Sequence, residues 1–66
     1  MNILKLKGKI VENGLNIETL ASKIGVHKST LYRKLNEGEE FTIGEVLKIK
    51  EELNLTNDEA GNIFFG

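Results

Sequence analysis

Residues 20–31 read Leu-Ala-Ser-Lys-Ile-Gly-Val-His-Lys-Ser-Thr-Leu, and this pattern predicts two short helices joined by a turn. The turn, Gly25-Val26-His27, has only three residues. Two helices joined so tightly must cross steeply, which is the geometry of a helix-turn-helix. Ala21 supplies the small side chain that crossing backbones need, and Gly25 tolerates left-handed backbone angles at the corner. The sequence therefore predicts a helix-turn-helix in this region.

Capping residues set the bounds of the helices on either side of this turn. Residues 17–24 follow Asn16, a good N-cap, and end at Gly25. Residues 28–36 begin just after the turn, with Gly38 close behind them. The side chains expected to fill the angle between the two helices are Leu20, Ile24, Val26, Leu31 and Leu35.

Two further helices are predicted from capping boxes. Thr42 and Thr56 are each followed three residues later by Glu and preceded by an apolar residue, as in a capping box with an N′ hydrophobic side chain. The apolar residues expected on the buried faces are Ile43, Val46, Leu47 and Leu53 in the first of these helices, and Ala60, Ile63 and Phe64 in the second.

The N-terminal segment allows two interpretations. Residues 3–13 have apolar side chains at helical spacing, a possible cap at Asn2 and a terminating Gly14. The same segment alternates apolar residues with lysines, as an edge strand would. The chain has no proline and no other convincing strand. We therefore expect an all-α fold of five helices, with residues 1–66 forming one domain.

Composition excludes several function classes. The chain has no cysteine and only one histidine, so we expect no disulfide, no metal site and no cofactor. Its acidic residues cluster at helix starts and on solvated faces, where capping and solubility explain them. We therefore expect neither an enzyme nor a small-molecule substrate. No run approaches the length of a membrane span or resembles a signal peptide, so the expected location is the cytoplasm.

The net charge of −1 at first argues against a nucleic-acid partner, because such domains are often strongly basic. Residues 1–34, however, hold seven basic and two acidic residues, a net +5, and residues 35–66 hold two basic and eight acidic residues, a net −6. This asymmetry is a hint of a surface that faces a polyanion. We expect a dipolar molecule whose positive face lies on the third helix. The cations that belong to the helix-turn-helix are Lys23, Lys28, Arg33 and Lys34.

The exposed face of the third helix carries the candidate DNA contacts. At 100° per residue, Leu31 and Leu35 mark its buried side, and Ser29, Arg33 and Asn36 lie roughly opposite. Arg33 suits a bidentate contact with guanine. Lys28 and Ser29 lie in the first turn, the end that enters the major groove. Tyr32 on one flank suits a thymine methyl or a phosphate, and Thr30 and Asn36 suit backbone positioning.

The spacing of Leu20-Ala21, Gly25 and Leu31 resembles the Cro/repressor type of helix-turn-helix, the Xre-like family of small phage and bacterial regulators. The resemblance covers the whole chain, and the Ile63-Phe64-Phe65 run is similar to the end of short phage-encoded regulators of Gram-positive hosts. It implies a compact lambda-repressor-like domain that regulates transcription in a phage or prophage.

The resemblance also implies site residues and partners. The family's reading positions correspond to His27, Lys28, Ser29, Tyr32 and Arg33. Phosphate contacts would come from Ile17 and Glu18 and from the loop between Asn36 and Thr42. The partner would be a double-stranded DNA operator, read by a weak homodimer or by a dimer that forms on the DNA. Phe65 is a candidate self-association contact, and Phe64 is expected in the core beneath the first helix.

The chain departs from the family at two positions. Lys34 stands where an apolar residue is common, which suggests a rotated or extended third helix. His27 stands where a capping serine is usual, and because imidazole is a weak cap, His27 is a candidate for facing the DNA. Lys5, Lys7 and Lys9 form either a solvated face or phosphate contacts.

A second class of function stays open. The acidic half of the chain would also suit a protein-interaction module of the antitoxin or antirepressor type, docked on a basic partner.

Overall fold

The computed structural model describes residues 1–66 and has five α-helices and no strand. The helices are α1 (Ile3–Glu12), α2 (Ile17–Ile24), α3 (Lys28–Glu37), α4 (Ile43–Glu52) and α5 (Asn57–Phe64). The predicted all-α fold of five helices is confirmed, and the edge-strand alternative for the N-terminal segment is wrong. None of the helices is long and apolar enough to cross a membrane.

The predicted caps explain where the helices begin. The Asn2 side chain accepts a hydrogen bond from the backbone N–H of Lys5, which fixes the start of α1. The capping boxes that begin α4 at Thr42 and α5 at Thr56 are both formed. Asn16 caps α2 in a third capping box, in which Thr19 takes the place of the usual Glu. Each box satisfies backbone N–H groups that a helix start otherwise leaves unpaired.

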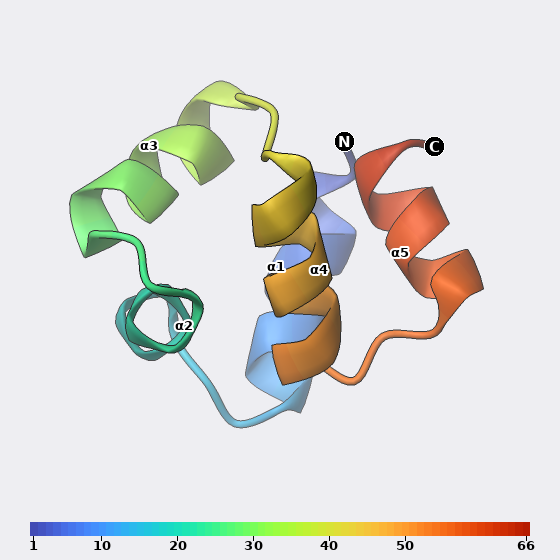
Figure 1. Ribbon diagram of the computed structural model, residues 1–66, viewed down its shortest axis with the longest axis horizontal. Coiled ribbons are helices and arrows are strands. Elements are labelled where there is room, and N and C mark those ends of the chain that lie inside the picture. The colour runs from blue at the N-terminus through green and yellow to red at the C-terminus, as the bar shows by residue number, and fades with distance from the viewer.

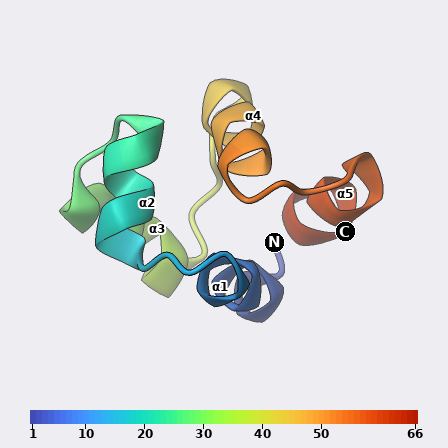
Figure 2. The ribbon, with the colours of Figure 1, turned by 90° about the horizontal axis from the view of Figure 1, so that it is seen from below.

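The five helices enclose one core. Figure 1 shows α1 behind α4, with α5 on one side of this pair and α2 and α3 on the other. Seen from below in Figure 2, α1 and α4 lie on opposite sides of the centre of the molecule. The N-terminus is joined to the last helix, because the backbone N–H of Asn2 donates to the carbonyl of Ile63 in α5 at 2.7 Å. The twelve buried residues of the core are Leu6, Ile10, Leu20, Ala21, Ile24, Leu31, Leu35, Ile49, Leu53, Leu55, Ala60 and Ile63.

The buried face of α4 differs from the prediction. Val46, Ile49 and Leu53 are buried, whereas Ile43 and Leu47 are 71% and 60% exposed. At 100° per residue the three buried side chains share one side of the helix, and Ile43 and Leu47 lie about a quarter and about a third of a turn away from its centre. Because α4 packs mainly against α2 and α5, only the first side is covered.

Candidate nucleic-acid interface

The turn between α2 and α3 is built from the residues that the sequence indicated. Gly25 ends α2 in the left-handed region, with φ at 78°, and the N–H of Val26 donates to the carbonyl of Ala21 at 3.0 Å. Ala21 is buried, with 1% of its surface exposed. Figure 1 looks along the axis of α2 while α3 runs across the view, so the two helices cross steeply.

One side of α3 packs against the rest of the molecule and the other side faces solvent. The buried residues of α3 are Leu31, Lys34 and Leu35. Thr30 is half-buried. In Figure 1, α3 lies at the edge of the molecule with no helix beyond its outer side. The predicted reading residues that are brought together on the exposed side are Lys28, Ser29, Tyr32, Arg33 and Asn36.

The start of α2 lies beside this exposed side of α3. Ile17, Tyr32 and Lys7 all line one groove of about 320 Å³, together with Ile10, Val11, Leu15 and Asn16. Ile17 is half-buried against the core, while Glu18 is exposed. Lys7 is exposed and brings a cation from α1 to the same surface. The sequence did not distinguish a solvated Lys7 from one that contacts phosphate. Residues 7 and 32 are distant along the chain, so local patterns do not show that they line the same groove.

His27 caps α3. Its Nδ1 accepts a hydrogen bond from the backbone N–H of Ser29 at 3.1 Å and lies 2.7 Å from the Ser29 hydroxyl oxygen. The ring is exposed. His27 therefore acts as the N-cap of α3, although imidazole is a weak cap. With Nδ1 engaged in the cap, Nε2 is the ring nitrogen that remains for an outside partner.

Lys34 does not belong to the exposed face, so its assignment to a positive face of α3 is wrong. The residue is only 8% exposed, and its amine lies 3.2 Å from the Glu45 carboxylate and 3.1 Å from the Glu40 carbonyl oxygen, above the Phe41 ring. The lysine stem is thus buried while its amine reaches polar partners at the edge of the core. Lys34 therefore lies at a buried position of α3, and the helix ends at Glu37, one residue beyond the predicted end at Asn36.

The Lys34 ion pair also affects Glu45, which belongs to the capping box of α4. Burial raises the pKa of the Glu45 carboxyl, but hydrogen bonds from the Thr42 N–H and the Lys34 amine outweigh it, and the pKa is lowered. The Thr42 hydroxyl accepts from the Glu45 N–H at 3.1 Å. Thr42 is exposed, although this hydrogen bond ties its side chain to the cap.

Two of the cations expected on the positive face are already paired with carboxylates. Arg33 is paired with Glu39, and Lys23 lies 4.0 Å from Glu52, so both cations meet carboxylates from the acidic half of the chain. Lys28 has no ion-pair partner among the five salt bridges of the structure. Tertiary pairing therefore neutralises much of the charge asymmetry between the two halves.

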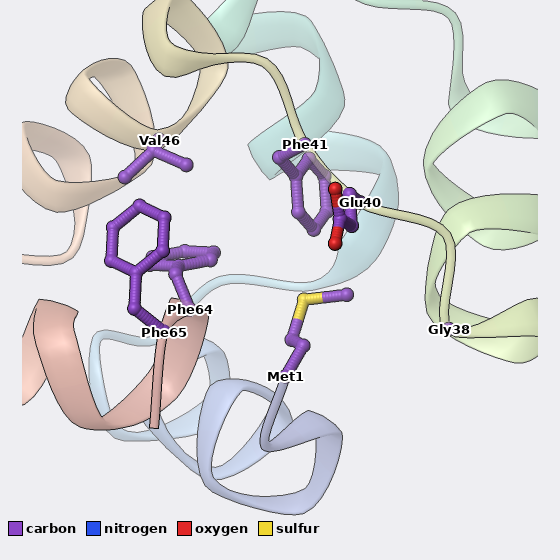
Figure 3. A pocket seen from close by; sticks show the side chains of 7 residues that line it. All are labelled: Met1, Gly38, Glu40, Phe41, Val46, Phe64 and Phe65. Atoms are coloured by element: carbon purple, nitrogen blue, oxygen red, sulfur yellow. The ribbon is translucent and has the colours of Figure 1, made fainter.

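A cavity of about 270 Å³ lies on the other side of the loop that follows α3 (Figure 3). Phe41, Phe64 and Phe65 line it with Met1, Val46, Gly38 and Glu40. The Phe41 and Phe64 rings meet edge to face, 5.8 Å apart, and Phe64 packs against the core, whereas Phe65 is largely exposed. The lining is mainly apolar and includes none of the exposed residues of α3.

The structure contains no group of three or more His, Asp or Glu side chains that could hold a metal ion. Comparison with protein-family models, with curated proteins and with solved structures finds no match to this chain.

Proposed function

We propose that the chain binds double-stranded DNA in a sequence-specific manner and regulates transcription. In this proposal α2, the turn and α3 form a helix-turn-helix of the lambda-repressor-like type, and α3 reads the major groove. The observation that supports it is the outer side of α3. Lys28, Ser29, Arg33 and Asn36 are exposed there, while the opposite side of the helix is fixed to the core by Leu31 and Leu35.

Each exposed group has a distinct role in this proposal. The Arg33 guanidinium donates two hydrogen bonds to guanine O6 and N7, and Lys28 and Ser29 reach bases or phosphates from the first turn. Lys7 and the backbone N–H groups at the start of α2 hold a phosphate, which the positive end of the helix dipole favours. Tyr32 lines the same groove as Lys7 and Ile17.

The size of the molecule suits binding as a pair. Half-sites read by such proteins are about 34 Å apart, one helical turn of DNA. The chain measures 27 × 23 × 21 Å, so two copies fit on one face of the duplex without overlapping. We propose a weak dimer that forms on an operator, with the protein acting as a phage or prophage regulator in the host cytoplasm.

Fluorescence anisotropy of a labelled mixed-sequence duplex, titrated with protein across a salt series, tests DNA binding. We expect affinity to fall steeply with salt, because each neutralised phosphate releases counterions. Arg33→Ala should weaken binding, because it removes a cation from the side of α3 that faces the duplex. Lys50→Ala, which removes the same charge from α4, is the matched control and should change binding little.

Selection from random duplexes then tests sequence specificity. Wild type should enrich a site that contains guanine, and Arg33→Ala should lose the preference at that position. An unchanged preference in Arg33→Ala would show that the assigned face of α3 is not the reading face.

A protein-binding module is the second candidate, favoured by one observation. Ile43 and Leu47 form an exposed apolar pair on α4, within the acidic half of the chain. Exposed apolar side chains of this kind are typical of protein contacts when they are rimmed by polar residues. No binding to the duplex even at low salt would overturn the DNA proposal and leave this one.

A further inference from the structure

Arg33 is held by a residue that lies beyond the end of its own helix. Glu39 follows Arg33 by six residues, a spacing that does not place two side chains on one face of a continuous helix. The left-handed Gly38, with φ at 66°, makes the contact possible. The N–H groups of Gly38 and Glu39 both donate to the Lys34 carbonyl, which turns the chain back along α3 and brings Glu39 to Arg33.

The loop that carries Glu39 is anchored on both sides. Before it, Gly38 closes α3. After it, the Lys34 amine donates to the Glu40 carbonyl at 3.1 Å, and Phe41 packs edge to face on Phe64. The Glu39 carboxylate is therefore presented to Arg33 by a fixed backbone. Both side chains are about half exposed, 48% for Arg33 and 41% for Glu39, so water and an incoming duplex can reach the pair.

We propose that Glu39 is a built-in competitor of DNA for Arg33, an inference that rests on the proposed DNA binding. In the free protein the carboxylate accepts from the guanidinium, as a phosphate or guanine would. DNA has to displace Glu39 before Arg33 can make its contact. Displacing Glu39 costs the Arg33–Glu39 ion pair. Two hydrogen bonds from Arg33 to guanine O6 and N7 offset this loss better than one hydrogen bond to a phosphate oxygen does. Glu39 is thus a specificity-determining residue that weakens binding to arbitrary DNA.

Three variants isolate this effect. Glu39→Gln removes the competing charge and leaves the backbone hydrogen bond of residue 39 in place. Glu40→Gln is the matched control, because it removes the same charge from the neighbouring position, and the Glu40 side chain pairs with no cation. In Figure 3 the Glu40 carboxylate lies at the cavity of Phe41 and Phe64. Arg33→Gln supplies a background that lacks the guanidinium for which Glu39 and DNA compete.

The measurement is the affinity for a mixed-sequence duplex by fluorescence anisotropy at low and moderate salt. Relative to Glu40→Gln, Glu39→Gln should bind about two- to fivefold more tightly, the range that exposed ion pairs provide. This gain should disappear in the Arg33→Gln background and shrink as salt screens the pair. Equal gains from Glu39→Gln and Glu40→Gln, or a gain that persists without Arg33, would mean that only net charge matters and would overturn the inference.

An NMR measurement on the free protein separates this inference from the proposed function. The Arg33 Nη–H signals should shift in Glu39→Gln and stay in place in Glu40→Gln, because Nη1 is the atom that pairs with Glu39. Unchanged Nη–H signals in Glu39→Gln would show that the pair does not form, whatever the DNA titration gives. A shift in the Nη–H signals, with no duplex binding by any variant at low salt, would overturn the proposed function and leave the ion pair without a DNA role.

Discussion

Replacing Lys34 by Met tests the ion pair that joins the end of α3 to the start of α4. Methionine keeps an unbranched apolar stem of similar length, so packing against the core changes little. The ammonium is lost, and with it the contacts to the Glu45 carboxylate at 3.2 Å and the Glu40 carbonyl at 3.1 Å. Glu45 is then left as a largely buried carboxylate whose nearest donor is the Thr42 N–H at 2.8 Å.

The degree of burial sets the expected magnitude. Breaking a fully buried pair by removing one partner costs about 3–5 kcal/mol, whereas exposed pairs are worth about 0–1 kcal/mol. The side chains of Lys34 and Glu45 are 10% and 17% exposed, and Glu45 retains one strong hydrogen bond. We therefore expect Lys34→Met to reduce the free energy of unfolding by about 2 kcal/mol, between these two limits.

Urea unfolding followed by circular dichroism measures this loss. With a slope of about 1 kcal/mol per molar urea, typical of a small protein, the midpoint should fall by about 2 M. Glu45→Gln keeps a side chain that can complete the capping box and, combined with Lys34→Met, closes a double-mutant cycle. A coupling energy of about 1–2 kcal/mol is expected. Coupling below about 0.5 kcal/mol, the value of an exposed pair, would refute the reasoning that burial strengthens this contact.

Three further predictions concern stability. Lys9 and the Thr56 N–H lower the pKa of Glu59 from 4.5 to about 2, so ionised Glu59 stabilises the fold above pH 4.5, and this contribution is lost as the pH falls toward 2. Thermal melts across this range should show a weaker acid dependence in Glu59→Gln; an unchanged dependence would contradict the role of the pair. Gly25→Ala should destabilise the protein by about 1 kcal/mol because φ is 78°, whereas Gly8→Ala, in an open helical position, should stabilise it by a similar amount. His27→Ala should cost about 1 kcal/mol in urea unfolding by removing the cap of α3, and His27→Ser should restore most of it; equal losses in both would argue against capping.

Much of the candidate interface was predictable because it depends on local periodicity. Once α3 was placed, the buried positions of Leu31 and Leu35 determined which side of the helix faces outward, and Arg33 and Asn36 are exposed there as expected. The position of Lys7 on the same surface as Tyr32 was not predictable in this way. It depends on α1 lying beside Tyr32, a contact between distant parts of the chain.

The charge pattern shows the limit of reasoning from composition. A net +5 in one half and −6 in the other suggested two faces of opposite sign, yet Arg33, Lys23 and Lys34 each meet a carboxylate from the acidic half. Opposite charges that are separate in sequence attract when folding brings them together, so a division along the chain need not become a division in space.

The bounds of the helices follow from local sequence. Caps and turn glycines act over three or four residues, so Asn16, Gly25, Thr42 and Thr56 specify helix ends without reference to the rest of the fold. Three features follow only from the packing of the helices: which apolar side of α4 is covered, where the amine of Lys34 points, and which carboxylate pairs with Arg33. These outcomes depend on how the helices pack and on where the loop after Gly38 returns, because burial and ion pairing are set by neighbours that sequence order does not reveal.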